Sequence, residues 1–408
     1  MAGTSHRPLR FCMVTTFYPP YSFGGDAVFV ERLSHELAKR GHQVDVVHCV
    51  DAYRMLGGKE PGGADRDHPG IRVHSLRSPA GWLWPLTMQQ TGGPAFHAGR
   101  LRELLESGFD VIHYHNVSLM GGPDVLAYGR AIKLYTMHEY WLVCPTHLLY
   151  RFQREPCERP HCFACTLAHK RPPQLWRYTG KLDAATRHVD AFLAASNFCL
   201  EAHRSRGLRA NIKLLPHFVP PAEPSVPAFV HPGPPYFLFV GRLETIKGLH
   251  TLLPHFQRET GAELWVAGAG SQETELRRLA AGNPRIRFLG HVTEPRLSEL
   301  YRNAMALVVP SLCYEIFPLV ILEAFRQRTP VIARRLGGMR ETVESSQGGI
   351  TYIGANELSS AMKLLLEQPA VRDRMGQRGL SAFLQQWTPE AHLDRYFSLI
   401  DEIAQTRP

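Results

Sequence analysis

The feature that most constrains the fold is a strand–loop–helix pattern that occurs in two series, one on each side of a proline-rich segment. In the first series, the apolar residues 9–16 predict a buried strand, which a glycine-containing loop and an amphipathic helix over 27–40 follow. This alternation is the repeating unit of a parallel sheet. Further strands are expected at 42–50, 71–75, 110–115, 133–137 and 191–194.

The second series begins directly after the prolines. Eight prolines fall within residues 216–235, and because proline lacks an amide donor this stretch predicts a linker or hinge. Strands are then expected at 236–241, 263–270, 285–290, 305–311 and 329–334, with helices between them.

The fold class predicted from both series is α/β, with two Rossmann-like parallel-sheet domains facing a cleft. We place an N-terminal domain at 1–217, a hinge at 218–235 and a C-terminal domain at 236–387. A C-terminal helix within 388–408 is expected to pack back toward the N-terminal domain. Ligands of open α/β sheets bind beyond the carboxyl ends of the strands, so the cleft is the expected site.

Length and composition exclude several classes. The 408 residues, 44% of them hydrophobic, suit about two compact domains. No uninterrupted apolar stretch approaches the roughly 20 residues of a spanning helix, and the first residues lack the apolar segment of a secretory signal. We expect a cytoplasmic protein, either free or peripheral at the inner face of the membrane.

The formal charge of +9 is unevenly placed, since residues 1–220 hold 26 Lys and Arg against 18 Asp and Glu. A basic half suggests an anionic partner such as phosphate, a membrane surface or nucleic acid, whereas the alternative is a solvated basic surface. No recognised nucleic-acid module is present, so a nucleic-acid partner is not expected.

The segment 311–324 carries two acidic residues, Glu315 and Glu323, after an apolar strand and around the start of a helix expected near Phe317. A helix N-terminus has unpaired amides and a partial positive charge, and carboxylates accept hydrogen bonds from vicinal hydroxyls. This pattern favours a site for a ligand with sugar and phosphate parts. The alternative is a helix capped by one glutamate with the other solvated.

The segment 239–248 places Arg242 and Lys247 in a loop after the first strand of the second domain. A guanidinium and an ammonium can neutralise a diphosphate without a metal, most strongly as charge develops on a leaving phosphate. Alone, such a pair is more often a surface feature. Its position at the carboxyl end of a strand favours a functional role.

The chain resembles family 4 of the retaining glycosyltransferases, which have the two-domain GT-B fold, over nearly its whole length. The likeness is carried by residues 18–47, DVIHYHN, TMHEYW, FVGRLETIKG, VAGAGSQETEL, RFLGHV, the Glu-x7-Glu segment and LGGMRETV. Many relatives have Gly at the position of Pro318 and often at that of Arg328, which puts fine specificity in doubt.

The resemblance implies a role for each matching residue. Arg242 and Lys247 would hold the donor diphosphate, Glu323 the nucleotide ribose and Glu315 the transferred sugar. His138, after the strand KLYTM, would contact the donor sugar. Gly24 and Gly25 would also bind the donor, because glycines allow close backbone approach. The remaining donor-binding residues would be Ile316, Phe317 and Leu319, and the amides near Phe317 and Leu319 would face the sugar or phosphate.

The predicted function is therefore retaining glycosyl transfer from a nucleotide diphosphate sugar, of UDP or GDP type, without a catalytic metal. The acceptor hydroxyl would belong to a glycan, a lipid-linked saccharide or a small molecule. Alternatives are a nucleotide-sugar epimerase or phosphorylase on the same fold, and a non-catalytic nucleotide-sugar-binding protein. Gly268-Ala269-Gly270 lacks the third glycine of a dinucleotide fingerprint, which argues against a nicotinamide dehydrogenase.

Four cysteines fall in a basic insert at about 144–170: Cys144, Cys157, Cys162 and Cys165. The last two form a C-x2-C pair, and four thiolates can close a tetrahedral zinc site. The interpretations left open are a structural zinc ion, free thiols, and an iron–sulfur cluster or disulfides. The insert is expected to form a knob near the acceptor side.

Overall fold

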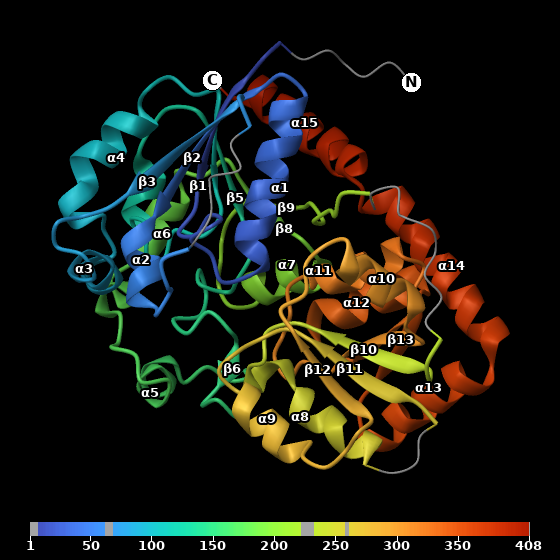
Figure 1. Ribbon diagram of the computed structural model, residues 1–408. Coiled ribbons are helices and arrows are strands. Elements are labelled where there is room, and N and C mark those ends of the chain that lie inside the picture. The colour runs from blue at the N-terminus through green and yellow to red at the C-terminus, as the bar shows by residue number, and fades with distance from the viewer. Residues whose placement is uncertain (1–6, 62–67, 222–231, 258–260, 408) are drawn as a thin grey trace.

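Two parallel sheets organise the chain, as the computed structural model in Figure 1 shows. The structure describes residues 7–61, 68–221, 232–257 and 261–407. The first sheet has seven strands in the order β3-β2-β1-β4-β5-β8-β9, and the second has six in the order β12-β11-β10-β13-β14-β15. Every strand pair in both sheets is parallel. The predicted α/β class is confirmed.

The first sheet is covered on both faces. Along β1, Phe11 and Met13 face one apolar cluster, whereas Cys12 and Val14 face another, as the two-residue period of a strand requires. Its strands are β1 (Arg10–Val14), β2 (Gln43–Cys49), β3 (Ile71–Leu76), β4 (Val111–Tyr114), β5 (Ile132–Thr136), β8 (Ala191–Ala194) and β9 (Ile212–Leu214). Its helices are α1 (Gly25–Lys39), α2 (Val50–Met55), α3 (Leu83–Thr91), η1 (Ala95–His97), α4 (Ala98–Leu105), η2 (Pro123–Ala127), η3 (Leu175–Tyr178), α6 (Lys181–Thr186) and α7 (Asn197–Arg204).

The second sheet is built in the same way. Phe237 and Phe239 of its first strand face one cluster and Tyr236 and Leu238 the other. Its strands are β10 (Tyr236–Val240), β11 (Glu263–Ala267), β12 (Ile286–Gly290), β13 (Ala306–Val309), β14 (Val331–Arg334) and β15 (Gly349–Tyr352). Its helices are η4 (Thr245–Lys247), α8 (Leu249–Leu252), η5 (Leu253–Phe256), α9 (Glu273–Leu279), α10 (Arg296–Asn303), α11 (Leu319–Arg326), α12 (Gly337–Ser346) and α13 (Ala355–Glu367).

The last two helices cross from one half of the molecule to the other. Helix α14 (Pro369–Gln386) packs on α11 and α13, and α15 (Pro389–Thr406) returns to the first sheet beside α1 (Figure 1). Tyr396 and Ile400 of α15 share an apolar cluster with Phe11 of β1. The chain also crosses at the proline-rich segment, of which residues 222–231 lie outside the described part.

Polar contacts fix the two halves against each other. The Glu341 carboxylate of α12 accepts hydrogen bonds from the backbone amides of Asn197 and Phe198 at 2.8 Å each, at the N-terminus of α7. A carboxylate is stabilised at a helix N-terminus by the unpaired amides and the helix dipole. The Ser196 hydroxyl donates to the Ile316 carbonyl at 2.8 Å. No helix of the described residues is both long and apolar enough to cross a bilayer.

Candidate active site

A pocket of about 400 Å³ lies between the two halves. Residues that follow β1 and β5 of the first sheet, and residues of β10 and β13 of the second, line it. Strands β1, β10 and β13 adjoin the points where strand order reverses, which is where open α/β sheets bind ligands. Its N-terminal wall, as we name it, consists of residues 24–26, 138–140, 147, 148 and 217. Its C-terminal wall consists of residues 239–242, 246, 247, 308, 309, 311 and 313–320.

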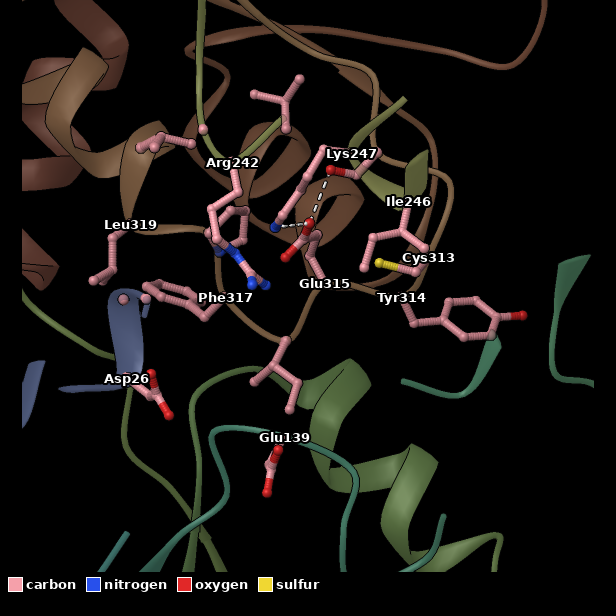
Figure 2. Close-up of a pocket in the computed structure, with 18 of the residues that line it drawn as sticks. Asp26, Glu139, Arg242, Ile246, Lys247, Cys313, Tyr314, Glu315, Phe317 and Leu319 are labelled. Atoms are coloured by element: carbon pink, nitrogen blue, oxygen red, sulfur yellow. Dashed lines mark hydrogen bonds and ion pairs between the residues drawn. The ribbon is translucent and has the colours of Figure 1, made fainter. Parts of the chain in front are cut away.

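The loop after β10 carries Arg242 and Lys247 into the pocket, as predicted from their position (Figure 2). Two glycines let this loop pack closely on its neighbours. Gly248 has a φ of +74°, and a Cβ there would lie 2.1 Å from the Pro310 carbonyl oxygen. A Cβ at Gly268 would lie 1.9 Å from the Gly241 carbonyl oxygen. The segment Gly268–Gly270 therefore packs directly against the loop that carries Arg242.

Lys247 forms an ion pair with Glu315 in the C-terminal wall. Its Nζ lies 2.6 Å from Glu315 Oε1, which also accepts from the Ser311 hydroxyl at 2.8 Å (Figure 2). Burial lowers the pKa of Lys247, but the Glu315 carboxylate outweighs burial and raises that pKa overall. Burial likewise raises the pKa of Glu315, and Lys247 reverses this and holds it low. Both groups are therefore charged at neutral pH.

Helix α11 begins at Leu319, two residues later than the start predicted near Phe317. Pro318 precedes it as the N-cap residue, with an extended backbone. The first turn of α11 lines the pocket at Leu319 and Val320, and Ile316 and Phe317 line it just before the helix. The structure thus brings this segment together with Arg242 and Lys247.

Glu323 does not line the pocket. It lies one turn into α11, where it pairs with Arg32 of α1 at 3.1 Å and accepts a hydrogen bond from the Tyr301 hydroxyl at 3.2 Å. Glu323 lies nearer the start of the helix than a start near Phe317 implies, because α11 begins at Leu319. The family resemblance implies that the Glu323 carboxylate binds the nucleotide ribose. In this structure Arg32 pairs with one of its two oxygens.

The N-terminal wall contains the other three predicted residues, Gly24, Gly25 and His138. The nearest atom to a Cβ built on Gly25 is Leu319 Cδ1 at 3.6 Å, an ordinary contact, so the protein itself leaves room there. His138 Nε2 lies 2.9 Å from His115 Nδ1. Burial lowers the pKa of His138 to about 3, so its imidazole is neutral at physiological pH.

Three residues that the sequence reasoning missed also line the N-terminal wall: Asp26, Glu139 and His147. His147 Nδ1 lies 2.8 Å from Glu139 Oε2, while Glu139 Oε1 is buried without a hydrogen-bond partner among the described residues. Burial raises the pKa of Asp26, and the Glu139 carboxylate raises it further. Two of the three directly follow predicted residues, since Asp26 succeeds Gly25 and Glu139 succeeds His138. That adjacency was an available signal.

Figure 2 shows how the two walls face each other. Arg242 and Lys247 extend from the C-terminal wall toward Glu315, and Asp26 and Glu139 lie on the opposite side. The C-terminal wall thus offers cations and helix amides to an anion, and the N-terminal wall offers carboxylates and a neutral imidazole to hydroxyl groups.

The four insert cysteines lie apart from this pocket and line a second, small cavity together. None of them forms a disulfide. As the side chains stand, no group of three or more His, Cys, Asp or Glu residues in the described ranges is placed so that it could hold a metal ion.

Known proteins show the same organisation. Residues 23–223 match the Glycosyltransferase Family 4 domain, and residues 234–368 match the domain named Glycosyl transferases group 1. Glycogen synthase of Mycobacterium tuberculosis (strain CDC 1551 / Oshkosh) is 28% identical over 90% of this chain and 88% of its own length. D-inositol 3-phosphate glycosyltransferase of Pseudarthrobacter chlorophenolicus is 26% identical over 93% of this chain and 91% of its own.

Solved structures agree in fold. Sucrose-phosphate synthase from Thermosynechococcus elongatus superposes with a TM-score of 0.73 at 22% identity, over 97% of this chain and 99% of that one. Anabaena Alr3699/HepE in complex with UDP-glucose superposes with a TM-score of 0.65 at 16% identity, over 98% and 99%. Together, these likenesses show that the chain is a glycosyltransferase with the GT-B fold, in which a Glycosyltransferase Family 4 domain precedes a Glycosyl transferases group 1 domain.

Proposed function

We propose that this glycosyltransferase moves a sugar from a nucleoside diphosphate sugar to an acceptor hydroxyl, with retention of anomeric configuration and without a catalytic metal. The observation that carries the proposal is the convergence of Arg242, the Lys247–Glu315 pair and the start of α11 on one pocket. Cations and helix amides suit a diphosphate, and a carboxylate beside them suits sugar hydroxyls.

In the proposed reaction, the bond between the anomeric carbon and the diphosphate oxygen breaks while Arg242 and Lys247 stabilise the leaving charge. The acceptor oxygen then bonds to the same face of the anomeric carbon, and its proton passes to the departing phosphate oxygen. Because Lys247 and Glu315 hold each other charged, the cationic part of the site is formed before the donor arrives. No carboxylate is assigned as a nucleophile.

The remaining predicted residues complete the donor site in this proposal. Gly24 and Gly25 allow the donor phosphate to approach the backbone at the start of α1. His138 contacts the transferred sugar as a neutral imidazole. Glu323 binds the ribose after Arg32 releases it, so donor binding competes with the Arg32–Glu323 ion pair.

The N-terminal wall receives the acceptor in this proposal. Asp26 and Glu139 accept hydrogen bonds from acceptor hydroxyls, and the unpartnered Glu139 Oε1 supports this role. The basic residues of the N-terminal half would attract a phosphate-linked or membrane-held acceptor from outside the pocket. The neighbour solved with UDP-glucose favours a UDP donor over GDP.

A donor screen tests the function. UDP- and GDP-sugars are incubated with the full chain, first alone and then with pools of glycans, lipid-linked saccharides or small polyols, and released nucleoside diphosphate is measured. We expect one donor to be hydrolysed slowly alone and much faster with one pool, with an α-anomeric donor giving an α-linked product. Conversion of the donor sugar without acceptor would indicate an epimerase, and binding without turnover a non-catalytic protein.

A further inference from the structure

The cysteine insert has little regular secondary structure, and its backbone is strained at several residues. Within residues 144–170 its secondary structure is limited to the two-residue strands β6 (Tyr150–Arg151) and β7 (Glu155–Pro156) and the helix α5 (Cys162–Ala168). Five of its non-glycine residues have positive φ angles, each costing about 1 kcal/mol in an L-residue. They are His147, Leu149, Phe152, Gln153 and Lys170.

Part of the insert is buried at Leu149, which packs on the apolar core, and at Tyr150, but its helix presents apolar side chains to solvent. On α5, Phe163 and Leu167 are each more than half exposed. A helix that exposes apolar side chains, in a segment with a strained backbone, needs another source of stability, such as a disulfide or a metal.

The four thiols converge on one cavity although they come from separate parts of the insert. Cys144 precedes β6, Cys157 follows β7, and Cys162 and Cys165 lie three residues apart on one face of α5. All four line a cavity of about 20 Å³, and no pair of them is joined by a disulfide. A cavity of this size admits a single water or ion, and an iron–sulfur cluster, which has several atoms, does not fit it.

Hydrogen-bond donors and cationic side chains surround the cysteine cavity. The Phe152 backbone amide donates to Cys165 Sγ at 3.3 Å. Arg206 donates to the Cys157 carbonyl at 2.7 Å and Arg171 to the Thr146 carbonyl at 3.4 Å, and Arg151 lines the cavity. These guanidinium groups place positive charge near the four sulfurs, where it would balance the negative charge of a four-thiolate metal site.

We propose that Cys144, Cys157, Cys162 and Cys165 bind one zinc ion and thereby fasten the insert. Four S–Zn bonds form as four S–H bonds break, the protons pass to solvent, and the net charge of −2 faces the nearby arginines. The thiols turn toward one another about their Cα–Cβ bonds to complete the tetrahedron. All four side chains already line this one cavity.

The zinc site also supports the N-terminal wall of the pocket. Cys144 lies between Glu139 and His147 in the chain, and its amide donates to the Tyr140 carbonyl at 2.7 Å. The Tyr140 amide donates in turn to the His147 carbonyl at 3.1 Å. Anchoring Cys144 therefore holds the turn that positions the Glu139–His147 pair. This role does not depend on the identity of the donor or acceptor.

Metal analysis of the purified full chain tests the proposal. We expect about one zinc per chain by mass spectrometry, at least a tenfold loss of zinc in the double variant Cys162→Ser/Cys165→Ser, and unchanged zinc in Cys49→Ser. Cys49 is a matched control because its sulfur accepts from the Ala52 amide at the start of α2, a role that serine performs well. Cys157→His keeps a zinc-binding ligand set and should retain both the metal and the fold.

Two further readouts exclude the other interpretations. In denaturant, all eight cysteines should react with a thiol reagent, whereas a disulfide would leave fewer. Replacing zinc by cobalt should give the thiolate-to-metal charge-transfer absorption of a sulfur-rich tetrahedral site. Zinc-free protein from zinc-supplied cells, a missing pair of thiols, iron with acid-labile sulfide, or full zinc content in the Cys162→Ser/Cys165→Ser variant would each overturn the proposal.

Discussion

The two walls of the pocket arise from equivalent edges of two similar sheets, yet their electrostatics are opposite. The C-terminal wall holds charged groups, the Lys247–Glu315 pair and Arg242. The N-terminal wall holds His138, which burial keeps neutral, and the carboxylates Asp26 and Glu139. In the proposed function, one fold supplies a charge-stabilising surface and a hydroxyl-binding surface, because the loops rather than the strands set the chemistry.

Buried histidines explain part of the difference. His138 stacks with His115 at a centroid distance of 5.2 Å and lies 4.9 Å from the ring of His217. Desolvation opposes protonation of all three, and their mutual repulsion would add to it. The N-terminal wall therefore rests on a core that tolerates no added charge, whereas the C-terminal wall is stabilised by a charge pair.

The largest expected effect is the loss of Arg242. We expect Arg242→Ala to lower turnover by about 10²- to 10³-fold, because the variant removes a fixed charge from the leaving diphosphate. The side chain is exposed in the pocket, so the midpoint of thermal unfolding should change little. Arg278→Ala, which removes an exposed ion pair with Glu275 on α9, is the control and should leave turnover unchanged. Near-normal turnover in Arg242→Ala would refute the role of the C-terminal wall.

The free energy of unfolding should depend on pH through the buried histidines, whereas the charge pair of the C-terminal wall should not titrate near neutral pH. The pKa values of His138, at about 3, and His392, at about 4, lie below the ordinary 6.5, so the unfolded chain takes up protons that the folded chain does not. The free energy of unfolding should be level above about pH 7 and fall as the pH drops below about 6.5, by about 1.4 kcal/mol per pH unit for each such histidine.

Denaturant titrations at a series of pH values measure this slope.

The affinity for the nucleoside diphosphate should behave differently. Over the range from pH 6 to 8 it should stay nearly constant, because Lys247 has a raised pKa and Glu315 a lowered one. Stability that is level down to pH 5 would contradict the neutral assignment of the histidines.

Glu139→Gln tests whether the N-terminal wall binds the acceptor. Losing a charged hydrogen-bond acceptor costs about 1.5 to 3 kcal/mol, so the KM for the acceptor should rise by tenfold or more. Donor hydrolysis without acceptor should change little. Steady-state kinetics against each substrate separate the two effects. Glu155→Gln, which loses only a surface partner of Arg151, is the matched control. An equal rise in the KM for the donor would show that Glu139 contributes to donor binding instead.

Gly25→Ala gives a smaller effect. The nearest protein atom to the added Cβ is 3.6 Å away, so the fold should keep its thermal midpoint, whereas the donor phosphate would lose its closest approach. We expect the Kd for the nucleoside diphosphate, measured by calorimetry, to rise about tenfold. An unchanged Kd would show that the donor does not approach this glycine.

The smallest effect lies away from both walls. Arg328 has a φ of +60° and is exposed, at a position where many relatives have Gly. Arg328→Gly should raise the free energy of unfolding by about 0.5 to 1 kcal/mol in denaturant titrations and leave kcat unchanged. A loss of stability would mean that the Arg328 side chain makes contacts worth more than the strain.

Sequence reasoning located the elements well because their signals are local. The predicted strand at 191–194 coincides with β8, and the helix expected over 27–40 is α1 with a two-residue shift at its start. The short strands β9 and β15 were missed, since three or four residues give too little periodicity. The start of α11 was placed too early because nothing in the local pattern weighs Pro318 as an N-cap against Phe317 as a first helical residue.

The sequence by itself determined the two parallel sheets, the positions of Arg242 and Lys247 after β10, and the basic N-terminal half. Only the tertiary structure decided which side chains meet. It pairs Glu323 with Arg32, 291 residues away, and gathers four cysteines on one cavity. The reason is physical: periodicity reports which face of an element is buried, whereas contacts between distant elements depend on how the rigid sheets and helices pack.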